Sequence, residues 1–353
     1  MSQMNTLKRQ DEAAVPGRWM RSEIFEQAEV VARVIDLERR TAQALAAQLR
    51  RRKVRFAVLA ARGTSDHAAT LGKYVLGCSL GVPAALAAPS ITTLYHRPLD
   101  LKGVLVVGIS QSGRSTDILE YLRAASRAGA ITAAVTNDRS SPIARAAEHG
   151  FFLHAGLERS VAATKTFTAQ AACLYLLAAA WLGGREGARM ERGLDAVPRL
   201  IEAALGREEE VRSWMKERRG LERCVVIGRG FSYPVALETA LKLKEAAGVF
   251  AEGASAADFL HGPIAMARRQ ACDRLRAFLM WSKGAGLSSL RRVEKRLAAA
   301  GAAPLRLDVP DAEELFSPFP LAVLGQCAAL HLALLKGRDP DKPEGLSKVT
   351  RTR

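Results

Sequence analysis

Short apolar runs, each followed by a turn and an amphipathic helical pattern, recur along the chain. The runs at residues 56–60, 103–109, 131–136 and 224–227 are short, and most are rich in Val and Ile, which is typical of buried strands. The alternation of such strands with helices predicts an α/β fold, in which helices flank parallel sheets.

One unit of this pattern occurs twice. Residues 54–82 and residues 223–249 both contain an apolar run, then a turn with Arg-Gly and a Ser two residues later, then an amphipathic helix. The two turn glycines, Gly63 and Gly230, lie about one domain length apart. The repetition predicts two tandem domains of one αβα fold.

The repeat also suggests domain boundaries. We assign residues 20–184 to the first domain, with a helix around residues 22–49 at its start, and residues 222–336 to the second. Residues 185–221 are rich in charge at helical spacing and are predicted as solvated helices that link the domains. Residues 1–19 and 337–353 are predicted as terminal tails.

Composition suits one large or two medium globular domains. The chain has 353 residues, of which 48% are hydrophobic. The longest apolar stretch that we identify, residues 169–183, is rich in Ala and too short to span a bilayer, so it is predicted as a buried helix. The N-terminus lacks the apolar core of a signal peptide. We therefore predict no membrane partner and a cytoplasmic location.

The net charge of +16 does not by itself indicate a nucleic-acid partner. The sequence contains no zinc finger, no aromatic RNA-binding motif and no single basic stripe, and its charges are dispersed. We predict no nucleic-acid binding and a mostly solvated basic surface.

Cysteine and histidine spacing gives no sign of a metal. The five cysteines are far apart with no CxxC pair, which predicts buried, reduced thiols; only Cys272 has basic surroundings. The six histidines lack the spacing of metal ligands. We predict no metal site and no cofactor.

The sequence Ser-Gln-Ser-Gly-Arg-Ser at residues 110–115 is the strongest candidate for a binding loop. It follows a predicted strand and opens a predicted helix, whose unpaired N–H groups and partial positive charge suit a phosphate. Ser110, Ser112 and Ser115 add hydroxyl donors, and Gly113 allows close approach of the backbone. An ordinary serine-rich helix cap is the alternative, but the number of donors favours phosphate binding.

Two further loops also precede helices. Gly63, Thr64 and Ser65 follow a strand, where open α/β sheets place ligands, and His67 is predicted as a buried or capping residue rather than a catalytic one. Residues 160–166 open the Ala-rich helix with small residues and one lysine. They are equally compatible with a ligand contact and with a packed helix entry.

The second half contains three polar candidates. Lys242 and Glu245 are three residues apart on one helix face, which is also the spacing of a surface ion pair. His261 precedes Gly-Pro on a fixed turn, where a general acid or base is useful. Taken singly, each favours a structural role.

Taken together, six motifs resemble the isomerase half of glucosamine-6-phosphate synthase and its relatives, which carry two SIS (sugar isomerase) domains with a flavodoxin-like parallel sheet. The motifs occur in family order along nearly the whole chain: RGTSDHA (62–68), SQSGRS (110–115), ERSVAATKTFTAQ (158–170), GRGFSYPVALETALKLKE (228–245), AEGASAADFLHGP (251–263) and DPDKPEGLSK (339–348).

The resemblance implies roles for individual residues. The residues that match sugar-phosphate contacts are Thr64, Ser65, Ser110, Gln111, Ser112 and Ser115. We assign Gly63 and Lys242 to the same binding site. Val161 and Ala162 match backbone contacts to the sugar. Glu245 matches the base that moves a proton between C1 and C2. His261 matches the ring-opening group, which this family takes from the neighbouring subunit of a homodimer, and Lys348 matches a lysine that contacts the sugar carbonyl from a closing C-terminal tail.

Three departures from the synthase pattern refine this expectation. The sequence shows no N-terminal glutaminase domain, so the chain is expected to resemble the glutaminase-less branch of amino-sugar-phosphate deaminases and deglycases. Arg114 stands where the synthase has an acidic residue. Residues 267–278 carry four arginines where the family has an apolar strand, so either the strand is shortened to about 277–281 or the segment is abnormal, as a local reading-frame error would make it.

The resemblance implies an enzyme that converts glucosamine 6-phosphate, a phosphorylated amino sugar, to fructose 6-phosphate and ammonia. Two alternatives remain open from sequence. One is a deglycase that acts on a phosphorylated fructosamine, and the other is a non-catalytic protein that senses a sugar phosphate. Glu245, His261 and Lys348 together favour catalysis.

Overall fold

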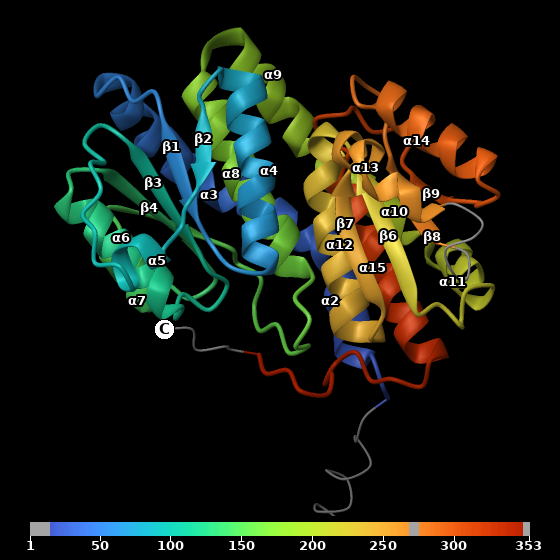
Figure 1. Cartoon of the computed structure of the whole chain (residues 1–353). Coiled ribbons are helices and arrows are strands. Elements are labelled where there is room, and N and C mark those ends of the chain that lie inside the picture. Colours follow the sequence, from blue (N-terminus) through green and yellow to red (C-terminus); the bar gives the residue numbers. More distant parts are fainter. Residues whose placement is uncertain (1–14, 268–274, 349–353) are drawn as a thin grey trace, which may run out of the picture.

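The computed structural model describes residues 15–267 and 275–348, which form two lobes that lie side by side (Figure 1). The first lobe is built on a five-stranded sheet in the order β2-β1-β3-β4-β5, and all of its strands are parallel. Its strands are β1 (Ala57–Ala60), β2 (Ala84–Leu86), β3 (Leu105–Ile109), β4 (Ile131–Thr136) and β5 (His149–Phe152).

The second lobe contains a four-stranded parallel sheet in the order β7-β6-β8-β9. Its strands are β6 (Arg223–Gly228), β7 (Phe250–Ser255), β8 (Arg276–Trp281) and β9 (Leu305–Asp308). The two parallel sheets, each flanked by helices, confirm the predicted fold class. Strand β8 begins one residue before the shortened strand expected at 277–281, and residues 268–274 of the arginine-rich segment lie outside the described residues.

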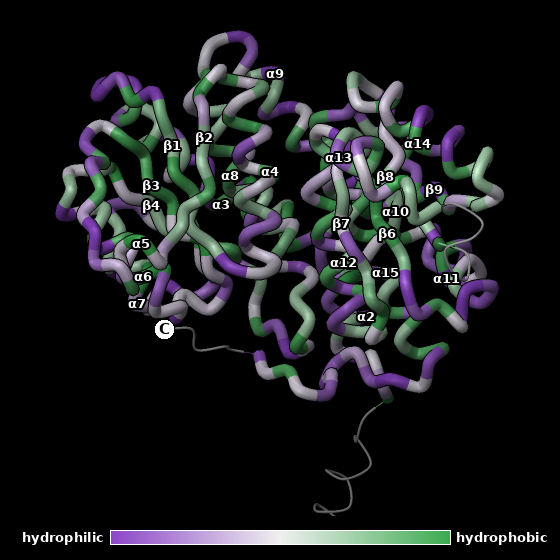
Figure 2. The backbone as a smooth tube through the Cα atoms, viewed as in Figure 1, coloured by the Kyte–Doolittle hydropathy of each residue, from purple (hydrophilic) through white to green (hydrophobic). Residues whose placement is uncertain are grey.

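Alternate residues of the central strands face opposite helical layers. Leu105 and Val107 of β3 belong to the apolar cluster on the inner side of the first sheet, whereas Val106 belongs to the cluster on the outer side. In Figure 2 the strands β3 and β4 are coloured mostly toward the hydrophobic end of the scale. Strands that are buried on both faces produce the continuous apolar runs seen in the sequence.

The helices of the first lobe divide between the two faces of its sheet. They are α3 (Gln27–Arg51), α4 (Thr64–Leu80), α5 (Ser90–Thr93), α6 (Thr116–Arg127), α7 (Pro142–Ala146) and α8 (Lys165–Leu182), whereas the preceding α2 (Arg18–Phe25) packs on α15 of the second lobe and on α3. Helices α3, α4 and α8 pack on the inner face, and α6 and α7 pack on the outer face. The single helix predicted around residues 22–49 is divided into α2 and α3 at Glu26.

The second lobe follows the same plan. Its helices are α12 (Tyr233–Ala247), α13 (Ala256–His261), α14 (Leu287–Ala299) and α15 (Pro318–Leu335), with short 3₁₀ turns η1 (Gly230–Ser232) and η2 (Pro263–Ala267). Helices α12 and α15 pack on the inner face of the second sheet, whereas α13 and α14 pack on the outer face.

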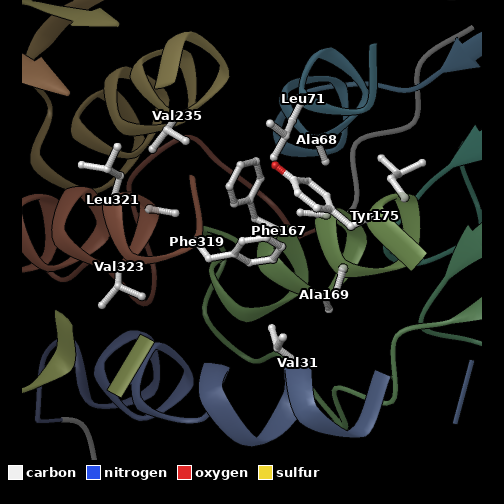
Figure 3. Packing of buried hydrophobic residues seen from close by; sticks show 14 of the residues in the cluster. Val31, Ala68, Leu71, Phe167, Ala169, Tyr175, Val235, Phe319, Leu321 and Val323 are labelled. Carbon is white, nitrogen blue, oxygen red and sulfur yellow. The ribbon is translucent and has the colours of Figure 1, made fainter. Parts of the chain in front are cut away.

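One apolar core joins the inner layers of both lobes. It contains residues of α3, α4 and α8 from the first lobe and of α12 and α15 from the second. In Figure 3, Val31, Leu71, Tyr175, Val235 and Phe319 project from these helices into the cluster. The ring centroids of Tyr175 and Phe319 lie 5.2 Å apart in an edge-to-face arrangement, which fixes α8 against α15.

Helix α15 is an apolar stretch that the sequence analysis missed. Its 18 residues reach a mean hydropathy of 1.6, so by length and composition it is the one described helix that could cross a membrane. However, 89% of this window is buried inside the protein. Its apolar side chains face the shared core, as those of a core helix do.

The charge-rich segment between the lobes is also part of this core. It forms α9 (Gly184–Asp195), α10 (Val197–Leu205) and α11 (Glu208–Lys216). Each helix buries one apolar face, with Leu194, Ile201 and Met215 among the buried residues, and α10 and α11 pack on α15. The linking helices that were predicted as solvated thus expose their charged faces to water and bury their apolar faces.

The cysteines follow the prediction with one exception. Cys173, Cys224 and Cys327 are buried free thiols, and burial raises the pKa of Cys224 and of Cys327 to about 12. Cys78 is exposed, so the prediction of a buried thiol is wrong there. Cys272 lies outside the described residues.

The close contact between α12 and α15 gives a test of the shared core. A Cβ atom added at Gly325 of α15 would lie 2.1 Å from Thr239 Oγ1 of α12, whereas one added at Gly77 of α4 would meet nothing within 4 Å. Gly325→Ala is expected to destabilise the protein by about 1–3 kcal/mol through overpacking. Gly77→Ala, the matched control, is expected to stabilise it by about 0.5–1 kcal/mol through helix propensity. Urea unfolding midpoints of both variants measure the difference, and equal midpoints would contradict the described helix contact.

Candidate active site

The order in which the chain adds strands to the first sheet reverses between β1 and β3. The chain leaves β1 toward β2 and then returns to the other side of β1 for β3. Open α/β sheets bind ligands beyond the carboxyl ends of the strands at such a switch point. The loop after β1 carries Gly63, Thr64 and Ser65, and the loop after β3 carries residues 110–115. The structure therefore brings both predicted phosphate-binding loops to one edge of the sheet.

The serine-rich loop after β3 is not an ordinary helix cap. Ser115 is the N-cap residue of α6, but its side chain makes no capping hydrogen bond and instead lies 3.1 Å from Ser110 Oγ. Ser112 Oγ accepts a bond of 3.3 Å from the Arg114 amide. Ser110 is buried, whereas Gln111, Ser112 and Ser115 are half-buried. The hydroxyl groups thus line a partly accessible helix start.

Glycine is required at position 113. Gly113 has φ of +62°, and a Cβ atom there would lie 2.1 Å from Ser141 Oγ and 2.7 Å from Thr136 Oγ1. The backbone of the loop therefore packs directly on the start of α7 and the end of β4. This packing fixes the shape of the loop.

The loop after β1 is tied to the serine loop and to α8. Arg62 Nε donates to Asp117 Oδ2 of α6 at 2.7 Å, and this links the two loops. Gly63 has φ of +56°, a conformation that favours glycine. Ser65 Oγ accepts a bond of 2.9 Å from Gln170 Nε2 of α8. Both loops are thus held from the interior of the first lobe.

A row of buried ionisable groups lies where α4 of the first lobe meets α12 of the second. Glu238 is 1% exposed, accepts a bond of 3.1 Å from Thr64 Oγ1 and lies 2.8 Å from His67 Nδ1. Lys242 Nζ lies 3.5 Å from Glu238 Oε1 and donates to Glu245 Oε2. The alternative of a surface ion pair is wrong, because Lys242 is fully buried and only Glu245 retains an exposed side-chain fraction of 25%.

These groups determine each other's charge. Burial alone would raise the pKa of Glu238, but Lys242, His67 and Thr64 together hold it below its usual value. Burial would lower the pKa of Lys242, but Glu238 and Glu245 hold it above its usual value. Glu238 and Lys242 therefore remain a charged pair, and removal of either partner would leave a costly buried charge. Glu245, the partly exposed end of the row, is the member that can meet a substrate.

The tail of the chain holds the loop ahead of α8. The Val161 amide donates to the Asp341 carbonyl at 3.1 Å, and Ala162 beside it is buried. The Asp341 carboxylate accepts bonds from the amides of Trp19 at 2.9 Å and Met20 at 2.7 Å, at the start of α2. In Figure 1 this tail, coloured red, runs from the second lobe toward the first. The tail thereby fixes the loop that carries the predicted sugar contacts.

Lys348, a residue of the tail, contacts the same loop. Its Nζ donates to Glu158 Oε2 at 2.9 Å and to the Ser160 carbonyl at 2.5 Å. The Glu158 carboxylate is fully buried, accepts the Thr166 amide at 3.2 Å, and helps to raise the pKa of Lys242. Lys348, Glu158 and the ionisable row on α12 therefore form one electrostatic cluster.

His261 lies apart from this cluster within one chain. It ends α13, on the outer face of the second sheet, and its side chain is exposed. Glu245 lies on α12, which packs on the inner face. A single chain therefore does not bring His261 to Glu245, and the expectation that a neighbouring subunit donates it stays a prediction.

Sequence reasoning missed several acidic members of the site. The missed residues are Glu23, Glu158, Glu238 and Asp341. Glu238 had a detectable signal, because it precedes Lys242 by four and Glu245 by seven residues and so shares their helix face. Glu23 and Asp341 are recruited through contacts distant in sequence. Glu158 bonds Thr166 within its own motif but reaches Lys348 only through the fold.

The arrangement combines two chemical capabilities. Hydroxyl donors at the start of α6 and the loop after β1 suit a phosphate group. The partly exposed Glu245 beside Lys242 suits proton transfer, and Lys348 supplies an amine. Among the described residues, no group of three or more His, Cys, Asp or Glu side chains could hold a metal ion.

Comparison with known proteins links these features to one family. The model of the SIS domain family matches two segments, residues 39–180 and 220–272. The first segment covers most of the first lobe, from α3 to α8, and the second begins just before β6 of the second lobe. The two matches parallel the repeated unit that is visible in the sequence.

Curated relatives align over nearly the whole chain. Glutamine–fructose-6-phosphate aminotransferase (isomerizing) from Thermococcus kodakarensis is 33% identical over 362 aligned residues, which cover 97% of this chain and 59% of the relative. The protein of the same name from Aquifex aeolicus is 33% identical, with coverage of 94% and 57%. The chain thus spans less than two thirds of the length of these relatives.

Solved structures share the arrangement of the two lobes. A crystal structure named for a phosphosugar isomerase from Silicibacter pomeroyi DSS-3 superposes with a TM-score of 0.83 and 33% identity, covering 92% of this chain and 99% of the other. Glucosamine-6-phosphate deaminase from Thermotoga maritima gives a TM-score of 0.76 at 20% identity, covering 95% and 100%. At this lower identity the likeness shows the fold alone.

The ionisation of Glu23 makes the stability of the protein depend on pH. It is buried beneath the loop ahead of α8, where it accepts bonds from the amides of Arg159 and Ser160. Burial raises the pKa of Glu23 from 4.5 to about 7, although the Arg159 amide opposes the shift. Because the folded pKa is the higher one, the stability from this group is present below about pH 4.5 and is lost as the pH rises through about 7.

Glu23→Gln is expected to remove this pH dependence, because a neutral amide cannot ionise. Relative to the variant, the wild-type protein should therefore lose stability as the pH rises from about 5 to about 8. Urea unfolding midpoints across this range measure the effect, with Glu29→Gln, an exposed residue of α3, as control. A constant difference between wild type and Glu23→Gln at all pH values would refute the assigned ionisation.

Proposed function

The chain belongs to the SIS domain family, and we propose that it is a sugar-phosphate isomerase that acts on a phosphorylated amino sugar. The specific reaction that we propose converts glucosamine 6-phosphate and water to fructose 6-phosphate and ammonia. The observation that carries this proposal is the contact between the loop after β1 and α12, in which Thr64 meets Glu238. This contact links a loop that is suited to bind phosphate to the row of buried ionisable groups on α12.

The phosphate end of the substrate would occupy the start of α6. Ser110, Ser112 and Ser115 offer hydroxyl groups there, and the N-terminal end of the helix favours a negative charge. The backbone of Val161 and Ala162 would contact the sugar, beside Lys348 of the tail. The positive φ of Gly113 and Gly63 allows both loops to approach the ligand closely.

The proton-transfer end would lie at Glu245. In the open-chain sugar, Glu245 removes the hydrogen from C2 and returns a proton to C1. A second proton passes from the C2 amine nitrogen to O1, so that the C1 aldehyde becomes an alcohol and the C2 amine becomes an imine. Water adds to this imine, and ammonia leaves as the C2 carbonyl of fructose 6-phosphate forms. The proposed sequence uses no metal and no organic cofactor.

Two further groups complete the proposed mechanism. His261 would open the sugar ring, and since it lies on the outer face of its own second sheet, the proposal requires a second subunit to supply it. We therefore also propose a homodimer. Lys348 would contact the sugar carbonyl from the tail. We also propose a cytoplasmic location and no nucleic-acid partner.

The assigned role of Glu245 gives a direct test. Glu245→Gln is expected to lower kcat for fructose 6-phosphate formation by about 10²–10⁴-fold, because an amide cannot carry the proton. Affinity for glucosamine 6-phosphate, measured by calorimetry, is expected to change little. A coupled assay of ammonia and of fructose 6-phosphate measures turnover. Glu202→Gln, an exposed residue of α10, is the control and should retain wild-type activity.

Substrate comparison separates this function from its alternatives. Release of an amino acid from a phosphorylated fructosamine, without ammonia from glucosamine 6-phosphate, would establish a deglycase instead. Tight binding of the sugar phosphate without turnover of any substrate would establish a sensing protein. Full activity of Glu245→Gln would exclude the proposed proton shuttle.

A further inference from the structure

His67 is a buried histidine that the proposed mechanism does not use. It lies in the first turn of α4, in the first lobe, and its side chain is 17% exposed. Its Nδ1 atom faces Glu238 Oε2 on α12 of the second lobe at 2.8 Å. The sequence analysis favoured a buried or capping role, but the structure shows a specific contact across the two lobes.

The Glu238 carboxylate has a separate partner for each of its oxygens. Oε1 accepts the Thr64 hydroxyl at 3.1 Å and lies 3.5 Å from Lys242 Nζ. Oε2 has its described partner in His67. Since Glu238 is almost completely buried, the loss of His67 would leave Oε2 without a donor where water has little access. The carboxylate would then rotate or take up a proton.

Either change would reach Glu245 through Lys242. Lys242 is buried between two carboxylates, Glu238 and Glu245, and the sum of their attractions holds its position and charge. If Glu238 turns away or becomes neutral, Lys242 has Glu245 as its stronger remaining partner. A closer ion pair would engage the Glu245 carboxylate more fully and leave it less available to the substrate.

We propose that His67 is a positioning residue that donates a hydrogen bond from Nδ1 to Glu238. By holding Glu238 against Lys242, it determines how strongly Lys242 pairs with Glu245 during proton transfer. This inference rests on the proposed function, since it assigns Glu245 as the proton shuttle. It makes the catalytic base on the second lobe dependent on a side chain of the first.

The geometry of the contact provides a matched pair of variants. The amide nitrogen of asparagine lies the same number of bonds from the backbone as His Nδ1, so His67→Asn can retain the donor to Glu238. His67→Leu fills similar space without any donor. A purely structural role that depends on filled volume would make the leucine variant the milder one, whereas the positioning role makes it the more severe one.

Steady-state kinetics and isotope exchange test the proposal. His67→Leu is expected to lower kcat and the rate of deuterium exchange at C2 of glucosamine 6-phosphate by roughly tenfold to a hundredfold, with KM changed less than about threefold. His67→Asn is expected to remain within about threefold of wild type in all three values. Equal losses in both variants, or wild-type exchange in His67→Leu, would overturn the proposal.

A second measurement does not depend on turnover. In the full-length protein labelled with ¹⁵N-histidine, the NMR signals of His67 are expected to show a proton on Nδ1 at neutral pH and to shift in Glu238→Gln. A ring protonated only on Nε2 would overturn the inference even if the enzyme is active. If the wild type turns over no sugar phosphate, the proposed function fails, and the NMR result still decides whether His67 donates to Glu238.

Discussion

The apolar core between the lobes is the constraint on which the rest of the site depends. Helices α4 and α8 of one lobe pack against α12 and α15 of the other in a single cluster, with the rings of Tyr175 and Phe319 in contact. This packing leaves α4 and α12 no freedom to separate. The buried row from His67 to Glu245 can exist only because the apolar contacts around it fix the distance between the two helices. Ion pairs at this depth do not hold elements together by themselves, since desolvation offsets most of their attraction.

The same constraint explains how residues distant in sequence form one site. The loops after β1 and β3 are placed by the reversal of strand order in the first sheet, and Glu245 is placed by α12 from the second lobe. Lys348 arrives from the tail, which is itself fastened to the loop ahead of α8 through Val161 and Asp341. These components are held by backbone or buried contacts within one chain, so their arrangement does not depend on a ligand. Such preorganisation is what the proposed proton transfer between adjacent carbons would require.

The sequence was sufficient to predict the central strands but not the edges. The strands β1, β3, β4 and β6 appear as apolar runs, because both of their faces are buried. The missed strands β2, β5, β7 and β9 are the four edge strands of the two sheets, where half-exposed positions admit His, Glu and Arg. Likewise, local motifs were sufficient to locate the loops after β1 and β3 and to place Lys242 and Glu245 on one helix face. The long-range contacts of Glu158, Glu238 and Asp341 could not be predicted, because tertiary packing supplies those partners.

The hydrogen bonds between the tail and the start of α2 affect the order in which parts of the protein fold during synthesis. The amides of Trp19 and Met20 are among the first described groups to be synthesised, yet they bond to Asp341, which lies 322 and 321 residues further along the chain. During translation, the first lobe can therefore assemble its sheet while the start of α2 and the loop at Val161 still lack their partner. The loop ahead of α8 receives this support only after Asp341 has left the ribosome, so a nascent chain can be folded in the core of its first lobe while this loop still lacks its partner.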